Sequence, residues 1–296
     1  MLHALQAAIR DCPPPPPDRD VRHHATQFVF NPIFTYWTKE CRPHSVSMGN
    51  AYSFVKTVAA TALHRDMPWA ECQTILQESM EQYIHERIDF ADLAIAKVAA
   101  EKLTDGDVLL TYGNYEAIQV VLLEAHNNNS HIRFRVIVVD SKPLLEGKRM
   151  LRKLREAGID CTYILLNALS YVMKHVTKIL LGAEALLNDG SAYSRVGTAC
   201  VALAAQDRIP VLVCAETYKI SNRVQLEAIT NNELGNPEHV VPGELNENLR
   251  VINLLYDLTP ASMISGIVTE MGLLPPSSVA VLLREMNPQE AATGDF

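Results

Sequence analysis

The second part of the chain contains short apolar runs that restrict what it can fold into. Five of them are rich in Val, Ile and Leu and lie at 108–112, 134–139, 161–166, 178–182 and 210–214. Segments with helical periodicity separate most of these runs. A strand that is apolar throughout is buried on both faces, which requires helices on both sides of a parallel sheet. The runs therefore predict a Rossmann-like, doubly wound α/β domain.

The N-terminal part of the chain has a different pattern. Apolar residues recur at helical spacing up to about residue 103, with almost no alternation of period two. A short amphipathic helix is expected before the prolines at 13–17, which cannot continue a helix. We favour a linker for this proline run over a recognition ligand for an aromatic groove. The predicted domains are a short helix and proline-rich linker (1–18), a helical domain (19–106) and the Rossmann-like domain (107–296).

The composition limits the classes of function. The 296 residues carry a formal net charge of −8, which argues against a broad face for nucleic-acid phosphates. Six cysteines without a C-x-x-C pair suit reduced thiols. The first residues lack the pattern of a secretory signal, and no apolar stretch approaches the ~20 residues that span a bilayer. We expect a cytoplasmic protein with no membrane contact, no direct nucleic-acid partner, no metal ion and no cofactor.

Polar residues follow several of the predicted strands, where parallel sheets bind their ligands. Lys142 follows the second strand and is placed to neutralise a phosphate, although a solvated surface lysine is the more frequent outcome. Arg195 lies among small residues just ahead of an Ala-rich helix, whose N-terminus can attract an anion. Neither segment matches a Walker A loop or G-x-G-x-x-G, so nucleotide binding is only weakly indicated.

Several segments carry a resemblance to a known superfamily. They read RPHSVSMGNA (42–51), DSKPLLEG (140–147), GAEALLNDGSAYSRVGT (182–198), VLVCAETYK (211–219) and YDLTPASMISGIVTEMG (256–272). Together they are similar to the superfamily shared by two groups of proteins. One group comprises the isomerases of methylthioribose-1-phosphate and ribose-1,5-bisphosphate. The other comprises the regulatory alpha, beta and delta subunits of eukaryotic translation initiation factor 2B. The sequences of the segments are most similar to the delta subunit.

The resemblance implies a fold that has lost its catalytic groups. Isomerases of this family move a proton with a cysteine in a T-H-C-N turn and an aspartate after the third strand. In this chain Gly113 stands at the cysteine position and Leu166 at the aspartate position, or Asn167 if the alignment shifts by one residue. None of these side chains exchanges protons usefully at neutral pH. Cys161 and Cys200 are expected to have buried structural roles.

The resemblance also implies a remnant of the substrate pocket and a set of partners. The pocket would be a vestigial anion pocket built from Asn114, Lys142, Glu184, Ser194 and Arg195. The implied partners are the other exchange-factor subunits (a beta-type partner, alpha, gamma and epsilon) and initiation factor two, especially its phosphorylated alpha subunit. Candidate partner-binding residues in the helical domain are Arg42, Ser45, Ser47 and Asn50, which could equally serve to pack the domains together.

Three functions are compatible with these observations. The leading interpretation is a non-catalytic, delta-like regulatory and scaffold subunit of the guanine-nucleotide exchange factor for initiation factor two. The alternatives are a sugar-phosphate isomerase, disfavoured by Gly113 and Leu166, and a non-catalytic sensor of a sugar phosphate or nucleotide. The segment 256–272 is further expected to expose apolar surface when the chain is unpaired.

Overall fold

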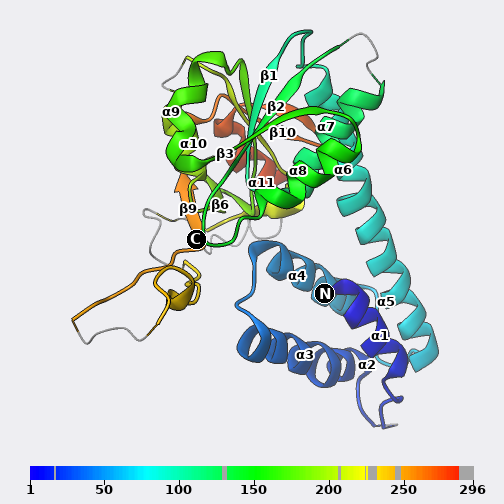
Figure 1. Cartoon of the computed structure of the whole chain (residues 1–296). Helices are drawn as coiled ribbons and strands as arrows, with labels where there is room; N and C mark the ends of the chain where they lie inside the picture. Colours follow the sequence, from blue (N-terminus) through cyan, green and yellow to red (C-terminus); the bar gives the residue numbers. More distant parts are fainter. Residues whose placement is uncertain are drawn as a thin grey trace. The chain divides into compact units, whose positions relative to one another are not determined.

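The chain folds into two compact units, Met1–Phe90 and Ala91–Phe296. The computed structural model describes residues 1–16, 18–128, 132–205, 208–223, 225, 232–243 and 248–286 (Figure 1). Pro17, the last residue of the proline run, lies outside these ranges. In the described part of the chain, no helix combines the length and the apolar character needed to cross a membrane.

The first unit is helical, as the periodicity predicts. Its α-helices are α1 (Leu2–Asp11), α2 (Val21–His24), α3 (Asn31–Tyr36), α4 (Val46–Thr61) and α5 (Trp69–Ile84), with π-helical turns at Ala25–Phe30, Trp37–Cys41 and His85–Asp89. Its core includes the fully buried Leu5, Ile9, Phe30 and Leu76. The chain entering the proline run is held to this unit, because the Trp69 indole N–H donates to the Cys12 carbonyl at 3.0 Å.

The second unit is built on a seven-stranded sheet with the order β11-β10-β7-β4-β1-β2-β3. The strands are β1 (Val108–Tyr112), β2 (Arg135–Asp140), β3 (Asp160–Leu165), β4 (Lys178–Gly182), β7 (Val211–Cys214), β10 (Gly266–Thr269) and β11 (Gly272–Leu274). All neighbours pair in parallel except β10 with the edge strand β11. The five strands predicted from apolar runs coincide with β1, β2, β3, β4 and β7 to within one residue at either end.

Helices cover both faces of this sheet (Figure 1). One core contains α6 (Phe90–Ala100), α7 (Glu116–Asn128) and α8 (Gly147–Glu156), together with Leu109, Val136 and Leu180. The other contains α9 (Leu169–Val172), α10 (Thr198–Ala204) and α11 (Val279–Met286), together with Leu110, Ile137 and Ile179. Successive residues of one strand thus enter opposite cores, which explains why the strands are apolar throughout. The predicted fold class, a helical N-terminal region followed by a doubly wound parallel sheet, is confirmed.

The boundary between the two compact units lies between Phe90 and Ala91, earlier along the chain than the predicted domain boundary between residues 106 and 107. The reason is helix α6, which the sequence assigned to the helical domain. Its residues Ile95, Ala96 and Ala99 are fully buried in the core beneath β1 and α7. This helix therefore belongs to the second unit by packing, although its periodicity resembles that of the helices before it.

A smaller sheet with the order β8-β5-β6-β9 was not predicted. Its strands are β5 (Ala185–Leu187), β6 (Ala192–Arg195), β8 (Ile220–Ser221) and β9 (Tyr256–Thr259). They are two to four residues long. Runs this short carry no measurable alternation, and β5 and β6 flank an Asp-Gly turn that dominates the local sequence.

Exposed apolar side chains lie both within and before the segment 256–272, where apolar surface was expected. Within 256–272, Tyr256, Ile264, Ile267 and Val268 are buried, whereas Leu258, Ala261 and Met263 are half-buried. The most exposed ones nearby are Leu234 and Ile252, at 70% and 72%, followed by Met271 at 60%. The strand β10 is buried in the large sheet, so the apolar surface expected for 256–272 is concentrated at Met271, and further apolar exposure lies at the preceding Leu234 and Ile252.

Candidate functional site

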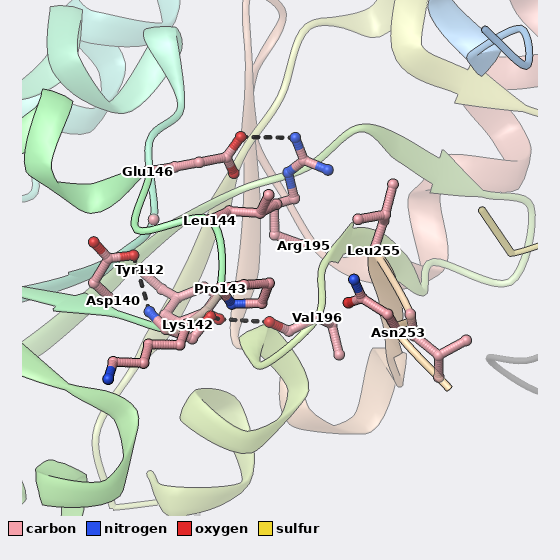
Figure 2. Close-up of a pocket in the computed structure, with 13 residues that line it drawn as sticks. Tyr112, Asp140, Lys142, Pro143, Leu144, Glu146, Arg195, Val196, Asn253 and Leu255 are labelled. Carbon is pink, nitrogen blue, oxygen red and sulfur yellow. Dashed lines mark hydrogen bonds and ion pairs between the residues drawn. The ribbon is translucent and has the colours of Figure 1, made fainter. Parts of the chain in front are cut away.

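The order of the large sheet creates a switch point between β1 and β4. The chain continues from β1 toward β2 and β3 on one side, and from β4 toward β7 and β10 on the other. In such sheets the crevice beyond the carboxyl ends of the two central strands is where ligands bind. A cavity of about 30 Å³ lies at this end of β1 and β2. It is lined by Tyr112, Gly113, Asp140, Ser141, Lys142, Pro143, Leu144, Glu146, Arg195, Val196, Asn253, Leu254 and Leu255 (Figure 2).

Tyr112 takes up much of the space in this crevice. It is the last residue of β1 and is 3% exposed. Its hydroxyl donates to the Val196 carbonyl at 2.5 Å and lies 2.7 Å from Ser141 Oγ. Burial raises the pKa of Tyr112 to about 12, so the hydroxyl stays protonated and acts as a donor. The enclosed volume that remains has room for only one or two water molecules.

The residues expected at the family's acid and base positions, Gly113 and Leu166, carry no group that exchanges protons. Gly113 has a left-handed backbone (φ +67°) and donates its N–H to the Val139 carbonyl at 2.9 Å. A Cβ at Gly113 would have no neighbour within 4 Å, so the thiol is missing from an open position. Leu166 begins the 3-10 turn after β3 and packs against the apolar core. Asn167 follows it in the same turn.

The thiols of Cys161 and Cys200 have different surroundings. Cys161 lies near the start of β3, at the opposite end of the sheet, and burial raises the pKa of its thiol to about 11. Cys200 lies inside α10, as expected, but its side chain is exposed rather than buried. The expected buried role is therefore wrong for Cys200, because the helix turns that position toward solvent.

Arg195 reaches the cavity but its charge is already compensated. Its guanidinium forms an ion pair with Glu146 at 2.8 Å, and both side chains are about one-quarter exposed (24% and 28%). A dashed line in Figure 2 marks this ion pair at the edge of the cavity. Arg195 also lies over the ring of Tyr256 at 4.9 Å. The site therefore presents a neutral pair where the sequence suggested an isolated cation.

The other residues of the predicted anion pocket do not converge on the cavity. Lys142 lines it, but its side chain is exposed and extends away from Arg195 (Figure 2). The Ser194 hydroxyl is buried and donates to the Gly182 carbonyl at 3.0 Å. The Asn114 carbonyl oxygen accepts from Gln119 at 2.6 Å. Glu184 is half-buried, and neither Ser194, Asn114 nor Glu184 is among the lining residues.

The N-terminus of α10 holds an anion that belongs to the chain itself. Asp257 Oδ2 accepts from the backbone N–H groups of Gly197 at 2.7 Å and Ala199 at 3.0 Å. Burial raises the pKa of Asp257 to about 6, although these two donors favour its charged form. The backbone N–H groups that were expected to bind an anionic ligand are thus hydrogen-bonded to the carboxylate of Asp257 in β9. Sequence reasoning missed this residue, because no local signal links positions so far apart.

The predicted partner-binding residues lie around the start of α4. Ser45 caps this helix by accepting from the Met48 N–H at 3.3 Å, and its hydroxyl lies 2.9 Å from Ser47 Oγ. Asn50 is half-buried within the helix. Arg42 is exposed and donates to the Pro43 carbonyl at 3.2 Å. Ser45 therefore has a structural role of its own, and Arg42 is the most accessible of the four.

A second polar cluster lies beyond the carboxyl end of β7. Glu216 and Lys219 form a buried ion pair at 2.7 Å, with side chains that are 4% and 16% exposed. Burial and the neighbouring charge of Glu216 raise the pKa of Asp92, on α6, to about 7. The Thr217 N–H donates to Glu270 at 3.0 Å. No group of His, Cys, Asp and Glu within the ranges described above is arranged to hold a metal ion.

Comparison with known proteins shows which family the chain resembles. The model of the "Initiation factor 2 subunit family" matches residues 37–276. The chain is 42% identical over 261 residues to "Translation initiation factor eIF2B subunit delta" of Dictyostelium discoideum, covering 83% of this chain and 41% of that protein. It is 30% identical over 249 residues to the ribose 1,5-bisphosphate isomerase of Pyrococcus furiosus, covering 82% and 76%.

A solved structure agrees with this assignment. The match is a chain of the tetrameric eIF2B-beta2-delta2 complex from C. thermophilum, with a TM-score of 0.82 and 32% identity over 91% of this chain and 83% of that one. The chain spans about two-fifths of the length of its amoebal relative. The related proteins therefore include both regulatory subunits and isomerases. The family match over most of the sequence shows that this chain belongs to the initiation factor 2 subunit family.

Proposed function

We propose that this chain is a cytoplasmic, non-catalytic regulatory and scaffold subunit, delta-like, of the guanine-nucleotide exchange factor for eukaryotic translation initiation factor two. Its partners in this proposal are a beta-type subunit, the alpha, gamma and epsilon subunits, and initiation factor two with its phosphorylated alpha subunit. The similarity to a delta subunit at 42% identity supports the choice within the family.

The observation that carries the non-catalytic part is the pair Gly113 and Leu166 at the crevice. Proton transfer between neighbouring carbons needs a positioned acid or base on each face of the substrate. Neither side chain supplies one, and Tyr112, whose pKa burial raises to about 12, fills the adjoining space as a protonated donor. A sugar-phosphate sensor is supported less well, because Arg195 is paired with Glu146 and Asp257 occupies the N-terminus of α10.

Co-assembly tests the scaffold role. We expect the full chain to co-purify with a beta-type subunit and to enter the complete exchange factor. Within that complex, Arg42→Glu should leave assembly and basal GDP release unchanged but weaken inhibition by phosphorylated initiation factor two. Loss of one charge-assisted contact corresponds to about 1–3 kcal/mol of binding. Arg87→Glu, an exposed position elsewhere in the helical unit, is the matched control. Failure to assemble would refute the scaffold role, and normal inhibition with Arg42→Glu would refute only the assigned surface.

Assays of isomerisation test the non-catalytic part separately. We expect no turnover of ribose-1,5-bisphosphate or methylthioribose-1-phosphate above the rate without protein. The measurement is the conversion of each sugar phosphate, followed by NMR at several protein concentrations. Turnover that scales with protein and is abolished by alkylating one cysteine would contradict the proposal.

A further inference from the structure

Helix α8 carries a concentration of positive charge that is unusual in an acidic chain. Five of its ten residues are cations, and all five are exposed: Lys148, Arg149, Arg152, Lys153 and Arg155. The whole protein has 26 Lys and Arg against 34 Asp and Glu. Gly147, Met150 and Leu154 form the buried side of the helix. The charge is therefore gathered on a single outward face.

The stability of the helix does not explain this charge. Lys153 and Arg155 lie in the last turn, where cations interact favourably with the helix dipole. Lys148 and Arg149 lie in the first turn, which contains no acidic residue and where the dipole opposes cations. The N-cap residue Glu146 is paired with Arg195. In addition, Lys148 and Arg152, like Arg149 and Lys153, are like charges at i,i+4 spacing and repel each other. The arrangement costs the isolated helix stability.

Within the described part of the chain, the cations of α8 have no carboxylate partner. No ion pair or side-chain hydrogen bond joins any of them to an acid within the described ranges, whereas Lys178, Arg195 and Lys219 each have a carboxylate partner. The helix lies over β2 and β3 beside α7 (Figure 1), so these side chains point away from the sheet. Their charges are thus available to a partner.

The surface has an apolar element beside the charge. An open hollow of about 380 Å³ is lined by Lys148, Leu151, Arg152, Arg155 and Glu156. Lys148, Arg152 and Arg155 follow the i, i+4, i+7 spacing of one helical stripe, which we call the α8 stripe, and Leu151 lies next to it. Ten residues of helix extend for about 15 Å, enough for two or three turns of a partner helix.

We propose that the α8 stripe docks an acidic, amphipathic protein segment, with its carboxylates on the cations and one apolar side chain against Leu151. Carboxylates match the charge of Arg152 and Arg155 and can pair with guanidinium groups in bidentate fashion. A nucleic-acid backbone fits less well, because its phosphates and sugars offer no apolar side chain to place against Leu151. This interaction does not depend on the proposed assembly with exchange-factor subunits.

The test uses the full chain and a defined probe. The probe is a fluorescent helical peptide of Ala and Glu with one Leu, in which Glu residues flank the Leu at i±4 spacing. Fluorescence anisotropy should report binding that weakens with salt, and R152E/R155E should reduce the affinity by roughly tenfold or more. A probe with Ser in place of Leu should bind less tightly than the parent. K97E/R284E changes the net charge equally at exposed positions outside the stripe and should bind normally.

A second experiment with reversed charges distinguishes the loss of specific contacts from misfolding of the variant. The same peptide with Lys in place of Glu should bind R152E/R155E better than the unchanged protein, which a misfolded variant would not do. The proposal is overturned if both double variants bind the acidic probe alike. It is also overturned if the Leu and Ser probes bind equally, or if a single-stranded oligouridine binds the α8 stripe more tightly than the acidic probe.

Discussion

Replacing Gly197 with alanine is expected to lower the free energy of unfolding of the second unit by about 3–5 kcal/mol. Gly197 has a left-handed backbone (φ +106°), which a residue with a Cβ adopts at a cost. Its Cβ would lie 2.3 Å from the Tyr112 hydroxyl oxygen and 2.7 Å from Tyr112 Cζ. Tyr112 cannot withdraw easily, because its hydroxyl is held by Ser141 and the Val196 carbonyl.

The matched control for this change is Gly113→Ala. Gly113 also has a left-handed backbone (φ +67°), but a Cβ there would meet nothing within 4 Å. The free energy of unfolding lost in Gly113→Ala should therefore be limited to the cost of the backbone conformation, about 1 kcal/mol. Urea denaturation followed by near-UV circular dichroism measures both variants. Equal losses for the two variants would show that Tyr112 does not constrain the crevice.

The second large effect is expected at the ion pair beyond β7. Lys219→Met should destabilise the second unit by about 3 kcal/mol at pH 8, because a buried carboxylate that loses its cation is strongly unfavourable. Glu216 is 4% exposed, and its neighbour Asp92 would then face it without a compensating charge. At pH 5 the loss should be smaller, because Asp92 is protonated there and the repulsion between the two carboxylates disappears.

The direction of the pH dependence follows from the raised pKa of Asp92. In the unfolded chain this carboxyl ionises near 3.8, whereas burial and Glu216 raise the pKa of Asp92 in the folded chain to about 7. The folded state therefore holds the proton of Asp92 more tightly than the unfolded state does. The stability contributed by this protonation is fully present below about pH 4 and is lost as pH rises through 7. Asp92→Asn should flatten this dependence. A Lys219→Met effect that is the same at pH 5 and pH 8 would contradict the assignment.

The large sheet could be predicted from the sequence because burial on both faces leaves a clear signal. Val108–Tyr112 and Lys178–Gly182 are apolar runs of strand length, and their bounds match the structure. The small sheet could not be predicted, because strands such as Ile220–Ser221 depend on partners elsewhere in the chain rather than on their own pattern. Helix α6 shows the same limit, since its periodicity marks a helix but not the core it joins.

At the candidate site, local sequence predicts which catalytic groups are missing but not which side chains line the crevice. Gly113 and Leu166 are visible as substitutions at motif positions. Tyr112 ends the predicted strand at 108–112, and the contact of its hydroxyl with the Val196 carbonyl depends on how distant loops meet. A bulky aromatic residue directly before a turn glycine is the signal that could have identified it. Asp257 gave no such signal, because a cap supplied from β9 is not encoded near the helix it caps.

The pairing of β6 with β9 has a consequence for the order in which the protein folds. It joins residues 192–195 to residues 256–259, and β10 must then enter the large sheet between β7 and β11. Contacts between residues so distant in the sequence form slowly, because closing the loop between them reduces the chain's entropy before the contact stabilises the fold. During synthesis β1 and β2 can pair early, whereas the wall formed by Arg195, Val196 and Leu255 must wait for β9 to leave the ribosome. Until then the crevice beside Tyr112 stays open on one side.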